Sequence, residues 1–269
     1  MEGDNFLDQE RLWYPLGFIN IYHPFSSIHV NTILNTWIGM LSLAILVLVS
    51  RILIKNSTSR ATYIIKQIIQ SFIDLVEQSV GKFVEHYFTF TSSIFLFILA
   101  CNWVGLLPGI EEPTKDINTT LALSIVAFIY IHKETIKTHG IITYLKDYFM
   151  PFERFFPLNI LAGLAILPLK LLGEMSTVIS LSFRLFGNIF GGSIITSLAR
   201  KSIGDSLLFN FITTFSGFNI LLLSFFILFE GLLQAFVFSI LSLTNLAMAV
   251  KIEEESEASG SEQFSKESR

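Results

Sequence analysis

Long apolar segments, separated by short polar ones, fill most of the chain. Apolar runs over residues 33–54, 91–108 and 119–131 predict three membrane spans, since about 20 apolar residues carry a helix across a bilayer. Two longer runs follow, over 158–198 and 206–250. Because a helix rises 1.5 Å per residue, a run of about forty residues either breaks or lies strongly tilted. The pattern predicts an all-α integral membrane protein with about five membrane-embedded helices in a membrane domain over 33–250.

Two further segments complete this arrangement. Over residues 60–85, apolar residues recur every three or four positions with polar residues between them, which predicts an amphipathic helix lying along the membrane surface. The polar turn Arg200–Asp205 connects the last two apolar runs. We therefore expect those runs to form a long, tilted helical hairpin.

The charges predict the orientation. Arg11 is the one basic residue before the first span, whereas Arg51, Lys55, Arg60 and Lys66 follow it. Positive loops stay on the cytoplasmic side, so residues 1–32 are expected outside and the C-terminus in the cytoplasm. No cleavable signal or transit peptide is recognisable, which favours a bacterial plasma membrane, with an organelle-encoded inner or thylakoid membrane as the alternative. The Ser/Glu-rich residues 251–269 are expected to form a disordered acidic tail.

Composition narrows the function. The 269 residues are 52% hydrophobic and 15% charged, with a net charge of −4 and a single cysteine, Cys101. One cysteine gives no disulfide framework and no thiolate metal site. No phosphate-binding loop, zinc-hydrolase motif or serine-nucleophile motif is present. We expect no catalytic residue, metal, cofactor or nucleic-acid partner; the chain is not expected to be an enzyme on its own.

Arg184 lies deep inside the fourth apolar run. An arginine at the centre of a membrane helix costs about 2.5–3.5 kcal/mol on insertion scales, so its presence suggests function. At 100° per residue, one side of the helix around Arg184 carries only small residues: Gly173, Thr177, Ser180, Gly187 and Gly191. Glu174 and Asn188 project beside this stripe. The stripe is either a helix-packing face, with an arginine that snorkels or pairs with Glu174, or an ion pathway that meets a moving partner.

The last apolar run carries a polar stripe of its own. Glu230, Gln234 and Asn245 fall within about 60° of one another on a helix. A lone polar residue in a membrane helix commonly bonds a neighbouring helix. Three on one face, folded back against the helix of Arg184, favour a water-lined pathway.

Several motifs, in order, resemble those of subunit a of the F-type ATP synthases. They are Asn102-Trp-Val-Gly-Leu-Leu-Pro-Gly109, Asp116-Ile-Asn118, Gly173-Glu-Met-Ser176, Arg184-Leu-Phe-Gly-Asn188 and Gln234-Ala-Phe-Val-Phe238. The resemblance covers most of residues 28–248.

The resemblance implies a proton-translocating stator in the membrane sector. The family's c-ring turns against the face around Arg184, which separates two offset half-channels. Asn188 and Gln234 match positions lining the pathway, and Glu174 matches an acidic position on the cytoplasmic side. The implied partners are the c-ring, the peripheral-stalk b subunits, the remaining synthase subunits and membrane lipid.

The chain departs from the family pattern in places. Thr177 and Val178 stand where many members have a basic residue and proline, and Ser193 stands where many have an acid. Family members often have an acidic residue or histidine seven positions before the glutamine, where this chain has Ile227. We therefore interpret Glu230, four positions before Gln234, as a displaced proton relay. Asp205 or Glu111 would form the outer mouth of its channel. The alternative functions are a self-contained ion channel or secondary transporter, in which Arg184 binds an anionic substrate, and a structural scaffold.

Overall fold

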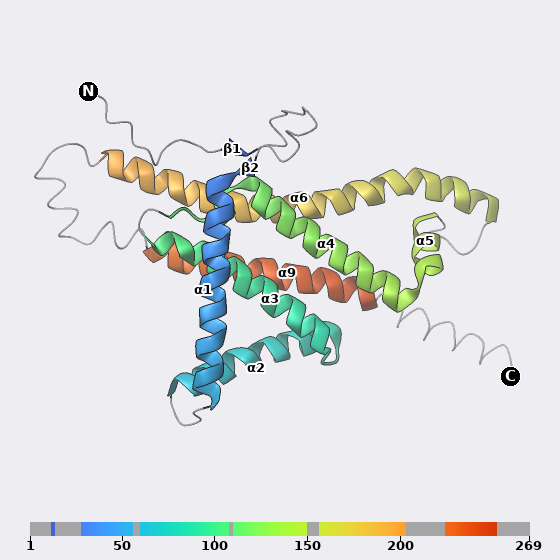
Figure 1. Ribbon diagram of the computed structural model, residues 1–269. Helices are drawn as coiled ribbons and strands as arrows, with labels where there is room; N and C mark the ends of the chain where they lie inside the picture. The colour runs from blue at the N-terminus through green and yellow to red at the C-terminus, as the bar shows by residue number, and fades with distance from the viewer. Residues whose placement is uncertain are drawn as a thin grey trace, which may run out of the picture. The chain divides into compact units, whose positions relative to one another are not determined.

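The computed structural model describes residues 12–13, 28–55, 60–107, 110–149, 156–202 and 224–251 (Figure 1). The chain divides into two compact units. Unit 1 comprises Met1–Ser57, Leu96–Thr119 and Phe186–Ala235, and unit 2 comprises Thr58–Phe95, Thr120–Leu185 and Phe236–Arg269. Four helices contribute to both units: α3 (Glu85–Trp103), α4 (Ile117–His139), α6 (Phe156–Ser202) and α9 (Gly231–Lys251).

The predicted all-α fold is confirmed. The one strand pair in the described residues is a two-residue antiparallel pairing of β1 (Leu12–Trp13) with β2 (Ile28–His29). Four described helical segments are long and apolar enough to cross a membrane: Val30–Lys55, Glu85–Leu106, Ile166–Ile195 and Phe225–Val250. Each corresponds to one of the predicted spans. The chain is therefore an integral membrane protein.

The fifth predicted span, 119–131, lies within α4 (Ile117–His139). This helix is long enough to cross a bilayer at 1.5 Å per residue. It is less apolar than the other four because its last turns carry Lys133, Glu134 and Lys137. The polar end begins directly after Ile131, where the predicted span stops.

In unit 1, helix α1 (Val30–Lys55) packs through a glycine and leaves most of its apolar surface exposed. A Cβ at Gly39 would lie 3.6 Å from both Sγ of Cys101 and Cγ2 of Val104. Cys101 lies in the last turn of α3 (Glu85–Trp103), and Val104 begins the 3-10 turn η3 (Val104–Leu106). The small residue lets the helices approach closely, as is usual in membrane proteins.

Also in unit 1, the end of α6 (Phe156–Ser202) packs antiparallel against the π-helix η5 (Ser224–Glu230) and the start of α9 (Gly231–Lys251). Asn188 of α6 forms a hydrogen bond with Gln234 of α9. Gly192, one turn after Asn188, lies against Phe226, which precedes Gln234 by two turns. The reversed order of these contacts is that of a hairpin. Of the expected turn Arg200–Asp205, the first three residues belong to α6, which continues to Ser202. The rest of the turn, with Asp205, and the first part of the last run lie outside the described residues.

In unit 2, the amphipathic helix is α2 (Arg60–Val80), which ends where Gly81 adopts a φ of 89°. Its apolar face joins a core with α3 and α9, made of Val76, Val80, Tyr87, Leu243, Leu246 and Ala247. Its other face exposes Tyr63, Ile64 and Ile68. An exposed apolar face beside polar residues is typical of a helix at the membrane surface.

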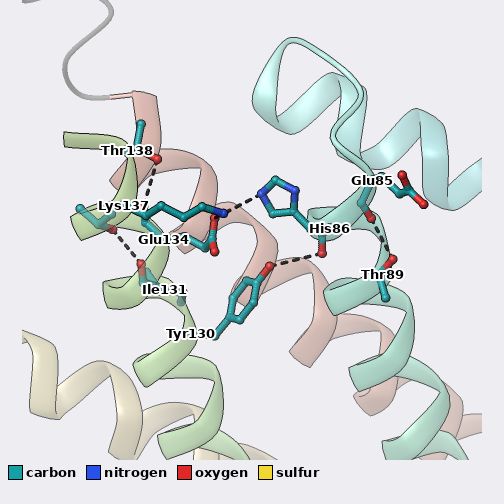
Figure 2. A network of polar contacts seen from close by, with 9 residues as sticks. Glu85, His86, Thr89, Tyr130, Ile131, Glu134, Lys137 and Thr138 are labelled. Carbon is teal, nitrogen blue, oxygen red and sulfur yellow. Dashed lines mark hydrogen bonds and ion pairs between the residues drawn. The ribbon is translucent and has the colours of Figure 1, made fainter. Parts of the chain in front are cut away.

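Helices α3 and α4 pack antiparallel in unit 2 through two stacked rings and through an ion-pair network. Figure 2 shows the ion-pair network. The rings of Phe90 and Tyr130 stack with centroids 3.8 Å apart. One turn away, Nε2 of His86 lies 3.2 Å from the Glu134 carboxylate, which Lys137 also approaches at 3.6 Å. The Glu134 side chain is only 5% exposed, and its carboxylate is held by the His86 imidazole and the Lys137 ammonium group.

Helix α6 runs without interruption over 47 residues, although Pro168 lies inside it. Of the two expectations for this apolar run, a break or a strong tilt, the break is therefore wrong, since Gly163, Pro168 and Gly173 all lie inside the helix. Of the predicted outer segment 1–32, the structure describes only 12–13 and 28–32. The expected disordered tail, 251–269, lies outside the described residues except for Lys251, which ends α9.

Candidate functional site

Arg184 is exposed on α6, and no described residue forms a salt bridge with it. The predicted small-residue stripe around it is open. A Cβ added at Gly173, Gly187 or Gly191 would meet no atom within 4 Å, and Thr177 and Ser180 are exposed. Gly192 differs, since a Cβ there would approach Cδ1 of Phe226 to 2.8 Å. The helix thus has a packed side and an unoccupied side, and Arg184 is on the unoccupied one.

Asn188 follows Arg184 by one turn of α6 and forms the central polar contact of unit 1. Its Nδ2 donates a hydrogen bond of 2.7 Å to Oε1 of Gln234 on α9. Gln234 is only 4% exposed, and its Nε2 has no hydrogen-bond partner among the described residues. An unpaired buried amide is costly, so this donor is suited to a polar group that enters the site.

Glu230 is the last residue of η5 and is half-buried. Two side chains from the end of α3 bind the backbone around it. Nδ2 of Asn102 donates to the carbonyl of Gly231 over 2.9 Å, and Nε1 of Trp103 donates to the carbonyl of Leu228 over 3.4 Å. Short π-helices commonly occur at functional sites because they change which side chains share a face. The π-helix therefore sets the direction of Glu230 relative to Gln234.

Glu174 lies in unit 2 on the earlier part of α6, and its side chain is 23% exposed. Its carboxylate is 4.0 Å from Nε2 of His132 on α4. The structure thus brings Asn188 to Gln234 and places His132 beside Glu174. No described residue forms a hydrogen bond or a salt bridge with the Glu230 side chain.

A cavity of about 440 Å³ lies in unit 1, between the start of α1, the segment 110–117 and two phenylalanines of α6. Its walls carry the carboxylates of Glu111, Glu112 and Asp116. Lys115 pairs with Glu111 at 3.1 Å, and the Thr32 hydroxyl donates to Asp116 over 3.1 Å. With three carboxylates and one lysine in its walls, the cavity is polar and acidic.

Glu112 is the most buried of these acids, and burial raises the pKa of its carboxyl. Its own backbone hydrogen bond and the Lys115 charge act in the opposite direction, while Glu111 adds to the increase. A carboxyl of this kind binds and releases protons nearer to neutral pH than an exposed glutamate does.

Three of the groups at these sites were not singled out from sequence. Asn102 is fully buried and also accepts a 2.7 Å bond from Thr114. Its only signal was its place in the motif that ends at Gly109. His132 and Glu112 gave no periodic signal, because their roles depend on which helices meet. Within the described ranges, no group of three His, Cys, Asp or Glu residues could hold a metal ion.

Comparison with known proteins decides the family. The model of the family described as "ATP synthase A chain" matches residues 33–246. The chain belongs to this family. Relatives named ATP synthase subunit a include one from Moorella thermoacetica, 29% identical over 234 residues, covering 87% of this chain and 93% of that protein. Another, from Helicobacter hepaticus, is 34% identical over 193 residues, covering 72% of this chain and 76% of that protein.

A third relative, named ATP synthase subunit a 2, comes from Picosynechococcus and is 31% identical over 204 residues. That match covers 73% of this chain and 78% of that protein. The family resemblance found in the motifs is thereby confirmed. The matched region contains Arg184, Asn188, Gln234, Glu174 and Glu230. The complex to which this family belongs carries out ATP synthesis and proton transport.

Proposed function

We propose that this subunit is the proton-translocating stator of the membrane sector of an ATP synthase. Arg184 faces the carboxylate of a rotating c-ring and separates two offset half-channels. The observation that carries the proposal is the open face of α6. Gly173, Gly187 and Gly191 leave space beside an exposed cation that has no salt-bridge partner among the described residues.

The chemistry of Arg184 suits this role. A guanidinium stays charged at any physiological pH. An opposite charge within about 4–6 Å favours the ionised form of a carboxylate, so a ring carboxylate that reaches Arg184 gives up its proton. The same fixed charge repels a proton that would otherwise cross directly between the half-channels. Proton flow is then tied to rotation of the ring.

The remaining residues divide between the two half-channels. Asn188 and Gln234 form an amide pair beside the open face, and the free Nε2 of Gln234 offers a donor to water or to the passing carboxylate. Glu230 is the relay of the outer half-channel, and the acidic cavity with Glu111 is its mouth. Glu174 serves the half-channel that opens to the cytoplasm.

This function sets the partners and the location. The open face binds the c-ring, and the exposed apolar surface of α1 contacts lipid and the peripheral-stalk b subunits. The complex lies in a bacterial plasma membrane, with the N-terminus outside and the C-terminus in the cytoplasm. An organelle-encoded copy in an inner or thylakoid membrane is the second choice. A self-contained transporter would need an acidic partner of its own beside Arg184, and no described residue supplies a salt bridge there.

The test is ATP-driven proton pumping by the whole complex in inverted membrane vesicles. We expect Arg184→Ala to abolish pumping while the soluble head still hydrolyses ATP once uncoupled. Glu230→Ala is expected to slow pumping, and the size of the loss measures its part in the relay. Arg60→Ala, which removes an exposed arginine at the start of α2, is the matched control. Normal pumping by Arg184→Ala would contradict the stator and favour a transporter.

A further inference from the structure

Three side chains of unit 2, from three different helices, form a chain of exchangeable groups. The hydroxyl of Tyr144, on α5 (Ile141–Phe149), lies 2.9 Å from Nδ1 of His132 on α4. The other ring nitrogen, Nε2, lies 4.0 Å from Oε2 of Glu174 on α6. Both nitrogens of one imidazole thus face groups that can exchange a proton.

The local fold holds this imidazole in place. Gly140 ends α4 with a φ of 81°, so the chain turns sharply and α5 begins at once. This turn returns Tyr144 to the side of His132, twelve residues earlier. The ring of Phe128, one turn before His132, packs edge-on against the imidazole with centroids 4.0 Å apart. The ring is therefore oriented by packing as well as by its hydrogen bond.

The chemistry of His132 is that of a proton carrier. It lies one residue beyond the predicted span 119–131. Partial burial lowers the pKa of its imidazole, the Glu174 carboxylate opposes this effect, and Lys170 adds to it. A neutral imidazole can accept a proton at one nitrogen and donate one from the other. The 4.0 Å gap to Glu174 is the length at which a small rotation, or one bridging water, completes a hydrogen-bonded path.

The cytoplasmic end of this path lies beside a shallow cavity of about 450 Å³. Its lining combines His132, Tyr144 and Lys133 with the apolar side chains Phe128, Ile129 and Ile136. Water in this cavity would exchange protons with the Tyr144 hydroxyl in either direction.

We propose that His132 is a proton relay of the cytoplasmic half-channel, passing protons between Glu174 and water with Tyr144 as its outlet. This inference rests on the proposed function. Protonated Glu174 gives its proton to Nε2, and the imidazolium releases the proton on Nδ1 through the Tyr144 hydroxyl to water. The carboxylate is then ionised, and the ring is neutral with its proton on Nε2. A rotation of the ring restores the first tautomer before the next proton passes.

The experiment uses inverted vesicles that hold the whole synthase, so that the cytoplasmic face is outside and its pH can be set. Pumping is measured against external pH for the native complex, His132→Ala, His132→Gln and Tyr144→Phe. We expect His132→Ala to slow pumping about a hundredfold, the low end of what a positioned acid–base group supplies. Millimolar imidazole in the external buffer should restore the rate of His132→Ala and leave the native rate unchanged.

The pH profile gives a second readout that a purely structural role would not move. In the pumping direction the path runs in reverse, and the imidazolium gives its proton to Glu174. The native rate should therefore fall when the external pH rises above the lowered pKa of His132, because less imidazolium is then present. His132→Gln should lack this fall. Tyr144→Phe should slow the exchange of protons with water while keeping the pH-dependent fall of the pumping rate. His86→Gln, which alters the other imidazole–carboxylate contact of unit 2, is the matched control and should keep the native profile.

The outcomes separate the two proposals. If His132→Gln keeps the native rate and pH profile, or if imidazole fails to restore an assembled His132→Ala complex, the relay is wrong. Arg184→Ala is measured in the same preparation. Loss of pumping there with no effect at His132 overturns only the relay, whereas normal pumping by Arg184→Ala overturns the stator itself.

Discussion

Nδ2 of Asn188 donates a 2.7 Å hydrogen bond to Oε1 of Gln234, and this bond joins α6 to α9 across 46 residues of sequence. The bond uses the only acceptor of the Gln234 side chain and leaves the donor Nε2 without a described partner. Asn188 therefore fixes the direction in which Gln234 presents its N–H groups. The pair acts as a unit, with Asn188 as the positioning residue and Gln234 as the donor.

A double-mutant cycle should detect this coupling. Asn188→Leu and Gln234→Leu are each expected to slow coupled pumping, and the double variant should lose less than the sum of the two. Hydrogen bonds between membrane helices couple by about 0.6 kcal/mol on average and reach about 1.7 kcal/mol. Pumping rates of the four complexes give the coupling. Thr244→Val on α9 is the control, because its hydroxyl bonds only its own helix at the carbonyl of Ile240.

Asn188 and Gln234 also show which parts of the polar site can be predicted from the sequence. The 3.6-residue period places Asn188 beside Arg184 and places Glu230 and Gln234 on one face, which suffices to nominate them as a polar site. The period cannot tell which residues of two helices touch. The structure adds the register, which pairs Asn188 with Gln234 and leaves Glu230 at the end of a π-helix.

The groups missed from sequence share one physical property: each depends on a long-range contact. His132 becomes interesting only because Gly140 turns α5 back and because α4 crosses α6 near Glu174. Glu112 is a loop residue whose buried side chain lies against Gly105 of η3, seven residues earlier. Hydropathy finds spans because each span is a local property of its own residues, whereas these contacts are not local.

The open face of α6 predicts a separation between stability and function. Gly187→Leu and Gly191→Leu should leave the thermal stability of the subunit unchanged or slightly higher, because a Cβ there meets no atom within 4 Å and leucine favours a helix by about 0.7 kcal/mol or more over glycine. Both should abolish pumping, since the added side chains occupy the space proposed for the c-ring. Pumping in vesicles and thermal unfolding of the purified complex measure the two effects.

Gly192→Ala is the matched control and should behave in the opposite way. Its Cβ would come within 2.8 Å of the Phe226 ring, so the ring must shift. Overpacking of this kind costs about 1–3 kcal/mol. We expect a lower Tm with pumping retained in the fraction that assembles. Equal behaviour of Gly191 and Gly192 variants would contradict the distinction between an open and a packed side.

Glu112 predicts a pH-dependent stability. Burial raises its pKa above the ordinary value of 4.5, so the folded protein holds this proton more tightly than the unfolded chain does. Ionisation of Glu112 therefore costs the folded state, and its penalty develops as the pH rises from about 4.5 through the raised pKa. Glu112→Gln should be more stable than the native chain at pH 8 and equal to it at pH 4.

Thermal unfolding of the purified complex at these two pH values checks this prediction. Each kcal/mol of penalty relieved raises the Tm by about 2–4 °C for a chain of this size. Glu111→Gln is the control, since the Glu111 side chain is 74% exposed and should change the Tm little at either pH. A gain for Glu112→Gln that is the same at pH 4 and pH 8 would show that ionisation is not its cause.

The carboxylate of Glu134 contacts both His86 and Lys137 in the ion-pair network of Figure 2. The carboxylate is 5% exposed, whereas the His86 and Lys137 side chains are 51% and 65% exposed. Removing one partner leaves the other, so His86→Gln and Lys137→Gln should each cost about 1 kcal/mol or less. Removing both leaves the buried carboxylate without either partner, which costs about 3–5 kcal/mol in comparable pairs. The double variant should therefore lose far more than the sum.

Adding Glu134→Gln to that double variant should restore much of the loss, because a neutral amide in the same place carries no unpaired charge. Thermal unfolding of the five complexes at one pH provides the comparison. If the triple variant is no more stable than the double variant, the cost arises from lost packing between α3 and α4. In that case the stacked rings of Phe90 and Tyr130, 3.8 Å apart, would hold the two helices together without help from the charges.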